Sequence, residues 1–145
     1  MRFPRGKSEI EEYVSDSTIE LEKGNIVKTG KDTAIFAFGN MLEIALEATE
    51  KINATVVDMR FVKPLDEALI IEIANKSKLL ISIEDNTVNG GAGSAGNELL
   101  QENNITTPLK ILGVPDKVTE HGSQSELYEL YGLTSENIIN VSKNK

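Results

Sequence analysis

The chain has 145 residues, 39% hydrophobic and 26% charged, which is ordinary for one globular domain with a single core. Its net charge of −8 and its pI of about 4.7 argue against nucleic acid or an anionic membrane as a main partner, since either needs a basic face. The absence of cysteine excludes disulfides and thiolate chemistry, one histidine argues against a zinc site, and no apolar run approaches the roughly 20 residues of a membrane span.

Residues 1–23 differ from the rest of the sequence because acidic side chains crowd a segment of weak periodicity. This pattern predicts a connecting arm outside the core. The first residues also lack the apolar region of a signal peptide, so we expect a cytoplasmic protein.

Strand and helix patterns alternate from residue 24 onward. Apolar and β-branched runs predict strands at residues 25–28, 33–38, 54–59, 79–83 and 109–114. Helices are predicted at residues 41–52, after the N-cap Asp66, from the glycine-rich loop to about residue 102, after the capping box at 123–126, and from residue 134. Because the strands show no polar alternation, helices should cover both faces of a mostly parallel sheet.

The stretch GAGSAG at residues 91–96 matches G-x-G-x-x-G, and Asp116 follows it as the acidic residue of a dinucleotide-binding fingerprint would. Three features oppose that function. A long polar segment separates the strand from the first glycine, Glu84 and Asp85 would repel a diphosphate, and a single strand follows the motif. We therefore interpret the glycines as permitting a tight loop and a close approach of helix to strand.

Charged residues gather after two of the predicted strands, where open α/β sheets usually carry function. Glu84 and Asp85 could form a general acid–base pair, but adjacent carboxylates at a strand end are more often solvated or at an interface. Arg60, Lys63 and Asp66 follow the strand at residues 54–59, with Asp66 as a cap and the two basic residues as surface or interface charges. All five are interface candidates.

Two further residues invite a chemical role. His121 lies in a loop with no nucleophile in a recognisable pattern beside it, so we interpret it as a loop residue. Arg5 stands between a proline and a glycine in FPRG, where a guanidinium could grip a phosphate, although an exposed terminal arginine is the simpler interpretation. The residues alone supply no catalytic constellation.

Four separated blocks carry a resemblance to a known family: RFPRG, DMRFVKPLDEALI, IEDNTVNGGAGSAGNELL and ILGVPDKVTEHGSQSELYELYGL. Together they resemble the C-terminal domain of the transketolase-type thiamine enzymes, and among these the 1-deoxy-D-xylulose-5-phosphate synthases. The similarity runs over nearly the whole chain and is weakest in the acidic arm.

The resemblance implies a fragment of a three-domain, cytoplasmic, homodimeric enzyme. Residues 1–23 would be the end of the pyrimidine-binding domain with a linker, and residues 24–145 the third domain. The implied fold is a three-layer α/β/α sandwich whose five-stranded sheet has its first strand antiparallel. The partners would be the missing N-terminal and middle domains.

The family enzyme condenses pyruvate with D-glyceraldehyde 3-phosphate, using thiamine diphosphate and Mg²⁺, to make a precursor of isoprenoids, thiamine and pyridoxal. The family's metal-binding motif and its activating glutamate are absent from this sequence. The resemblance implies that Arg5 helps to hold the substrate phosphate, that this chain binds no cofactor, and that it is inactive alone. Two alternatives stay open, namely another thiamine enzyme as parent (transketolase or a 2-oxo acid dehydrogenase) and a free-standing nucleotide-binding module.

Overall fold

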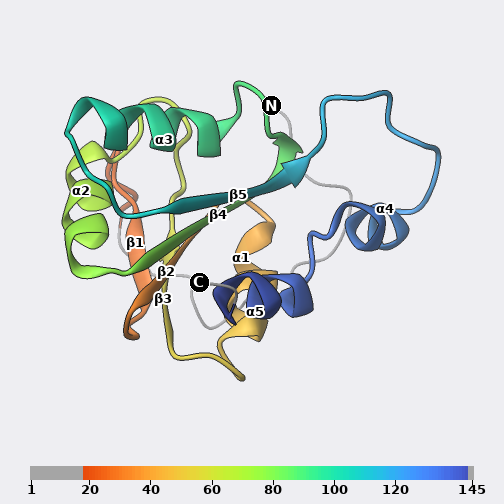
Figure 1. Ribbon diagram of the computed structural model, residues 1–145. Helices are drawn as coiled ribbons and strands as arrows, with labels where there is room; N and C mark the ends of the chain where they lie inside the picture. The colour runs from red at the N-terminus through yellow and green to blue at the C-terminus, as the bar shows by residue number, and fades with distance from the viewer. Residues whose placement is uncertain (1–17, 144–145) are drawn as a thin grey trace.

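A five-stranded sheet forms the centre of the computed structural model, which describes residues 18–143 (Figure 1). Its strands are β1 (Asn25–Lys28), β2 (Thr33–Ala37), β3 (Ala54–Asp58), β4 (Leu79–Thr87) and β5 (Leu109–Val114). They lie in the order β1-β3-β2-β4-β5, with β1 antiparallel to β3 and the other neighbours parallel. The predicted mostly parallel sheet with an antiparallel first strand is confirmed.

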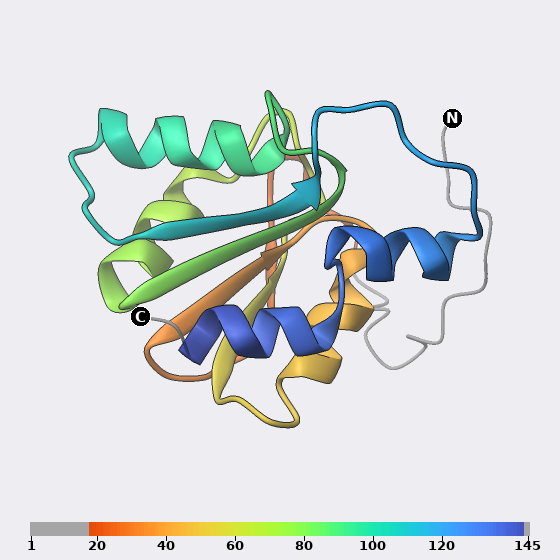
Figure 2. The same ribbon diagram turned by 45° about the vertical axis from the view of Figure 1, so that its right-hand side comes forward.

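Helices cover both faces of this sheet, as Figures 1 and 2 show. On one face lie α1 (Met41–Ala48) and α5 (Ser135–Lys143), and on the other lie α2 (Glu67–Lys76) and α3 (Ala92–Glu102). The remaining helix, α4 (Gln124–Tyr131), lies beyond the carboxyl ends of β4 and β5. The three-layer α/β/α sandwich is therefore confirmed.

The central strand β2 divides the core into two. All five of its residues are buried, and their side chains alternate between the faces. Ile35 and Ala37 join the cluster beneath α1 and α5, whereas Ala34 and Phe36 join the cluster beneath α2 and α3. An apolar strand without alternation is thus explained by burial on both sides.

Two element ends differ by more than one residue from the sequence-based expectation. Helix α1 ends at Ala48, because the next amides bond to carbonyls three residues back and the Thr49 hydroxyl donates to the Leu46 carbonyl. Strand β4 continues to Thr87, since its pairing with β5 resumes at Thr87 and Val114 after an irregularity. Glu84 and Asp85 consequently lie within β4 and not beyond its end.

Candidate functional site at the carboxyl end of the sheet

The interface candidates that the sequence singled out all lie near the carboxyl ends of the parallel strands. Arg60, Lys63 and Asp66 belong to residues 59–66, which connect β3 to α2, and Glu84 and Asp85 belong to β4. The neighbouring strands β2 and β4 flank the point where the strand order reverses, the usual ligand crevice of an open α/β sheet.

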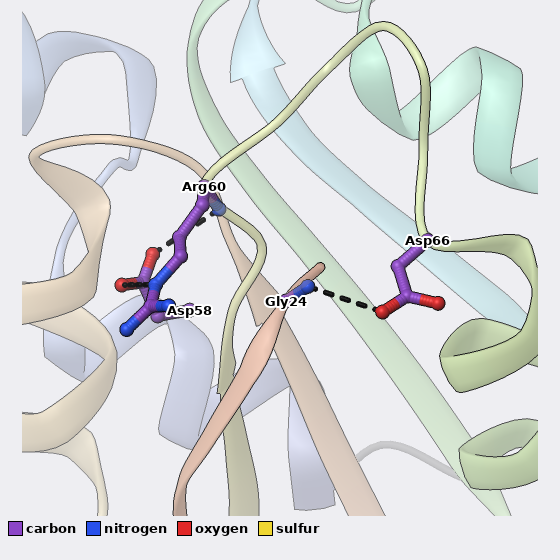
Figure 3. A network of polar contacts seen from close by, with 4 residues as sticks. All are labelled: Gly24, Asp58, Arg60 and Asp66. Atoms are coloured by element: carbon purple, nitrogen blue, oxygen red, sulfur yellow. Dashed lines mark hydrogen bonds and ion pairs between the residues drawn. The ribbon is translucent and has the colours of Figure 1, made fainter. Parts of the chain in front are cut away.

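Asp66 ties two elements together from a buried position. One carboxylate oxygen accepts the Leu69 amide at 3.1 Å and so caps α2, while the other accepts the Gly24 amide at 3.1 Å, directly before β1 (Figure 3). The exposed ammonium of Lys23 lies 3.7 Å from the same carboxylate. The predicted cap is confirmed, and the side chain also fixes where the edge strand begins.

Arg60 turns back onto its own strand. Its Nε lies 3.3 Å from the Asp58 carboxylate, and its amide donates to the other oxygen at 3.2 Å (Figure 3). Its φ is +56°, in the left-handed region, so this carboxylate holds a sharp turn. Lys63 precedes Pro64 through a cis peptide bond, and its side chain is exposed.

Glu84 is buried with 3% exposure and is bonded to the start of α3. Its two oxygens accept the amides of Ala92 at 2.9 Å and Gly93 at 2.8 Å. A helix N-terminus presents unpaired amides and a positive dipole end, which suit an anion. The carboxylate therefore occupies the position that a diphosphate would need, and the Glu84 side chain is shielded from solvent.

The glycines of the motif allow this close approach. A Cβ on Gly91 would lie 2.6 Å from both Glu84 carboxylate oxygens, and one on Gly93 would lie 2.5 Å from the Ser82 hydroxyl. Gly90 has a φ of +70°, which favours glycine. The interpretation of the motif as a tight loop with close helix–strand packing is confirmed.

Asp85 points outward and joins three elements. Its carboxylate accepts a hydrogen bond from the Tyr128 hydroxyl of α4 at 3.3 Å and another from the side-chain Nδ2 of Asn40, just before α1, at 3.5 Å. Gln124 donates to the Tyr128 oxygen at 2.7 Å. Burial raises the pKa of Tyr128 above its ordinary value, a hydrogen bond with Asn40 opposes this, and the Asp85 charge adds to the increase.

A groove of about 770 Å³ lies beside this network, and we call it the carboxyl-end groove. Its floor is the carboxyl ends of β4 and β5, and its wall is α4 with residues 115–123, the extended loop that Figure 2 shows leaving β5. Thr87, Leu127 and Tyr131 are among its lining residues. Lys117 places its ammonium 5.3 Å from the centre of the Tyr131 ring.

The remaining candidates form no reactive cluster. His121 is exposed in the loop of residues 115–123. Within residues 18–143, no group of three or more His, Asp or Glu side chains could hold a metal ion, and no helix is both long and apolar enough to cross a membrane. The FPRG segment with Arg5 lies outside the described residues.

Sequence reasoning missed two features, the inward turn of Glu84 and the carboxyl-end groove. A signal for the first was present, because a helix that opens on glycines offers bare amides and two carboxylates, those of Glu84 and Asp85, precede it closely in sequence. The groove had no local signal, since it arises where α4 meets strands that are distant in sequence.

Comparison with known proteins places this architecture in a family. The family model described as "Transketolase, C-terminal domain" matches residues 22–138. The chain belongs to the transketolase C-terminal domain family. The resemblance that the four sequence blocks carried is thereby confirmed.

Curated relatives of this transketolase C-terminal domain include 1-deoxy-D-xylulose-5-phosphate synthases. The chain is 47% identical over 134 residues to that of Aeromonas hydrophila and 46% identical over 139 residues to that of Vibrio vulnificus. These matches cover 92% and 95% of the chain but 22% of each relative. The chain thus spans about a fifth of the length of these relatives and matches their C-terminal part.

Two solved structures share the fold. One, described as "Split gene transketolase, inactive beta4 tetramer", has a TM-score of 0.81 and 36% identity and covers 89% of this chain and 44% of the other. Transketolase from Campylobacter jejuni has a TM-score of 0.57 at 17% identity, covers 86% of this chain and 19% of the other, and supports the fold alone.

Proposed function

We propose that this chain is the C-terminal domain of a 1-deoxy-D-xylulose-5-phosphate synthase and that its role there is structural. The supporting observation is identity of 43–47% to synthases of Aeromonas, Vibrio and Caldanaerobacter over at least 92% of the chain. The split gene transketolase reaches 36%. The parent would condense pyruvate with D-glyceraldehyde 3-phosphate.

Thiamine diphosphate would supply the parent's carbanion chemistry, and the described residues do not fit its diphosphate. The helix N-terminus after the glycine loop already holds the Glu84 carboxylate. Residues 18–143 also contain no cluster that could bind the accompanying Mg²⁺. The cofactor site of the parent would then lie in its other domains, and the same carboxylate argues against a free-standing nucleotide-binding module.

The domain would contribute interfaces through residues 60–66 and 84–93, which would face the missing domains or the dimer mate. Lys63 and Asp85 carry the exposed charges of these segments, whereas Asp66 and Glu84 hold their backbones in place. In the full-length parent, Lys63→Glu and Asp85→Lys should weaken dimerisation or activity. Lys51→Glu at the opposite end of the sheet is the control, and equal behaviour of all three variants would contradict the interface.

Arg5 would hold the phosphate of the aldehyde substrate, as its place in FPRG suggests. In the parent, Arg5→Ala should raise the KM for glyceraldehyde 3-phosphate at least tenfold and leave the KM for pyruvate near its original value. An equal effect on both substrates would argue against phosphate recognition.

The proposed function is tested by domain exchange. The purified chain should give no product with pyruvate and glyceraldehyde 3-phosphate. An Aeromonas hydrophila synthase whose corresponding part is replaced by this chain should regain measurable activity over the truncated synthase. An inactive but folded exchange, or micromolar binding of NADH, FAD or ATP by the purified chain, would overturn the proposal.

A further inference from the structure

We propose that Asn89 is a site of spontaneous covalent modification, at which asparagine converts to aspartate and isoaspartate through a cyclic imide, and that Ser94 sets the rate. The sequence contains one Asn-Gly pair, formed by Asn89 and Gly90. Asparagine is a thermolabile residue, and a following glycine has no side chain to hinder attack by its backbone nitrogen. The proposal concerns the free chain and does not depend on the proposed function. In the parent, a domain packed over residues 84–93 would slow the same reaction.

The reaction consumes water and releases ammonia. The Gly90 backbone nitrogen loses its proton and attacks Cγ of the Asn89 side chain, the bond between Cγ and Nδ2 breaks, and the leaving nitrogen departs with a proton as ammonia. Water then opens the cyclic imide at either of its carbonyl carbons, which gives aspartate or isoaspartate. In isoaspartate the main chain runs through the former side chain and is longer by one carbon. Either product carries a negative charge that asparagine lacks.

The structure leaves this pair accessible. Asn89 and Gly90 are both exposed in the turn between β4 and α3. Gly90 has a φ of +70°, and a Cβ placed on it would meet no atom within 4 Å, so the main chain has room to rearrange. The Asn89 Nδ2 donates to the Asp116 carboxylate at 3.4 Å, an exposed and long hydrogen bond that is a weak restraint on the side chain.

Ser94 sets the rate because it binds the proton that the reaction must remove. The Gly90 amide donates to Ser94 Oγ at 3.2 Å, and this hydroxyl is itself fixed by donating to the Val88 carbonyl at 2.6 Å. The Gly90 nitrogen can attack only after its bond to Ser94 opens. An exposed hydrogen bond contributes little net free energy, so this bond should slow the reaction several-fold without preventing it.

The modification affects the start of α3, because the turn lies between two fixed points. Before the turn, the Val88 amide donates to the Val114 carbonyl at 2.9 Å, and after it the Ala92 amide donates to Glu84. An additional main-chain carbon between these points displaces one of them. The new carboxylate also brings a like charge to Asp116 in place of a hydrogen-bond donor. The modified chain should therefore unfold at a lower urea concentration.

Incubation of the purified chain at pH 8, followed by peptide mass spectrometry, tests the proposal. Asn89 should convert at least tenfold faster than Asn97, which is also exposed but lies within α3 and precedes Glu98. Isoaspartate should be among the products. Conversion of Asn89 no faster than that of Asn97 would overturn the proposal.

Variants test the role of Ser94. Ser94→Ala should accelerate the conversion of Asn89 at least threefold, whereas Ser94→Thr keeps a hydroxyl and should leave the rate near its original value. Circular dichroism shows whether both variants are folded. Equal rates in two folded variants would overturn the assignment of Ser94.

Ageing tests the consequence for α3. After incubation, the urea midpoint should fall in the original chain and stay unchanged in Asn89→Gln, which cannot readily form the imide. Asn89→Asp, which carries the aspartate product from the start, should show a lower midpoint than Asn97→Asp, which adds the same charge within α3. An equal fall in the aged original chain and in aged Asn89→Gln would overturn the effect on the helix start.

Discussion

Glu84 carries its charge in the interior, at the first turn of α3. Its 3% exposure would be costly for a lone carboxylate, but the amides of Ala92 and Gly93 and the helix dipole compensate the charge. The same side chain is enclosed by Gly91, at which no larger residue fits. One residue thus fixes both the position of the helix and the character of the loop.

Replacing Glu84 should therefore destabilise the domain, because the amides of Ala92 and Gly93 lose their hydrogen-bond acceptor. Glu84→Ala leaves two shielded amides unpaired, and we expect it to lower the free energy of unfolding by about 3 kcal/mol. Glu84→Gln keeps one acceptor and should cost about half as much. Urea denaturation measures both, with exposed Asp85→Asn as the control. A loss below about 0.5 kcal/mol for Glu84→Ala would show that the carboxylate does not hold the helix start.

The raised pKa of Tyr128 predicts that the free energy of unfolding declines at alkaline pH. Its folded pKa is raised above 10.0, with burial as the main cause, so the unfolded chain releases this proton first as the pH rises. The contribution is complete below pH 10.0 and is lost as the pH passes through the folded pKa. Urea denaturation between pH 8 and 11 should show a shallower decline for Tyr128→Phe. An identical decline in both proteins would exclude this residue as a cause.

At the scale of elements, the sequence predicted the positions of the strands more accurately than the residues at which they end. The apolar runs located all five described strands, because burial on both faces requires such runs. They could not show that β4 continues through Asp85 and Asn86, since that extension depends on pairing with Val114 of β5. The carboxyl-end groove likewise depends on where α4 lies, which no local pattern records.

The glycines of α3 differ in what they permit, and this yields a matched pair of substitutions. Gly93→Ala would push a methyl group against Ser82 and Ile111, at 2.5 and 2.6 Å, and should cost about 2–3 kcal/mol. Gly96→Ala meets its nearest atom, Leu109 Cδ2, at an ordinary 3.8 Å, so the higher helix propensity of alanine should stabilise by up to about 1 kcal/mol.

Thermal and urea unfolding of the two glycine variants provide the measurement. Effects of the same sign would contradict the packing described for α3. Ser82→Ala in the Gly93→Ala background should recover part of the loss, because it removes the nearer of the two obstructing atoms.

At the scale of the whole molecule, the two cores share one sheet. Neighbouring residues of β2 face opposite clusters, so neither face can lose its packing while the strand stays intact. Asp66 adds a link from the edge strand to α2. The described domain should therefore respond to damage on either face as one unit.

Conservative substitutions on opposite faces test this unity. Ile138→Val removes a methyl group from the cluster under α1 and α5, and Ile70→Val removes one from the cluster under α2 and α3. Each should lower the free energy of unfolding by about 1 kcal/mol and leave a single transition. Far-ultraviolet circular dichroism and tyrosine fluorescence should coincide during urea unfolding. Separate midpoints in either variant would mean that the faces unfold independently.

The Glu84 carboxylate at the start of α3 has a consequence for the interpretation of other sequences. A glycine-rich turn whose backbone amides already bind a carboxylate of the same chain cannot bind a phosphate there, even when its sequence matches the nucleotide-binding motif at every position. Here the acid, Glu84, lies seven residues before the first glycine of the motif, Gly91, and the end of β4 and a turn separate the two. A sequence search that requires an acidic residue at this position before the motif would distinguish glycine-rich turns that bind their own carboxylate from those that can bind a cofactor phosphate.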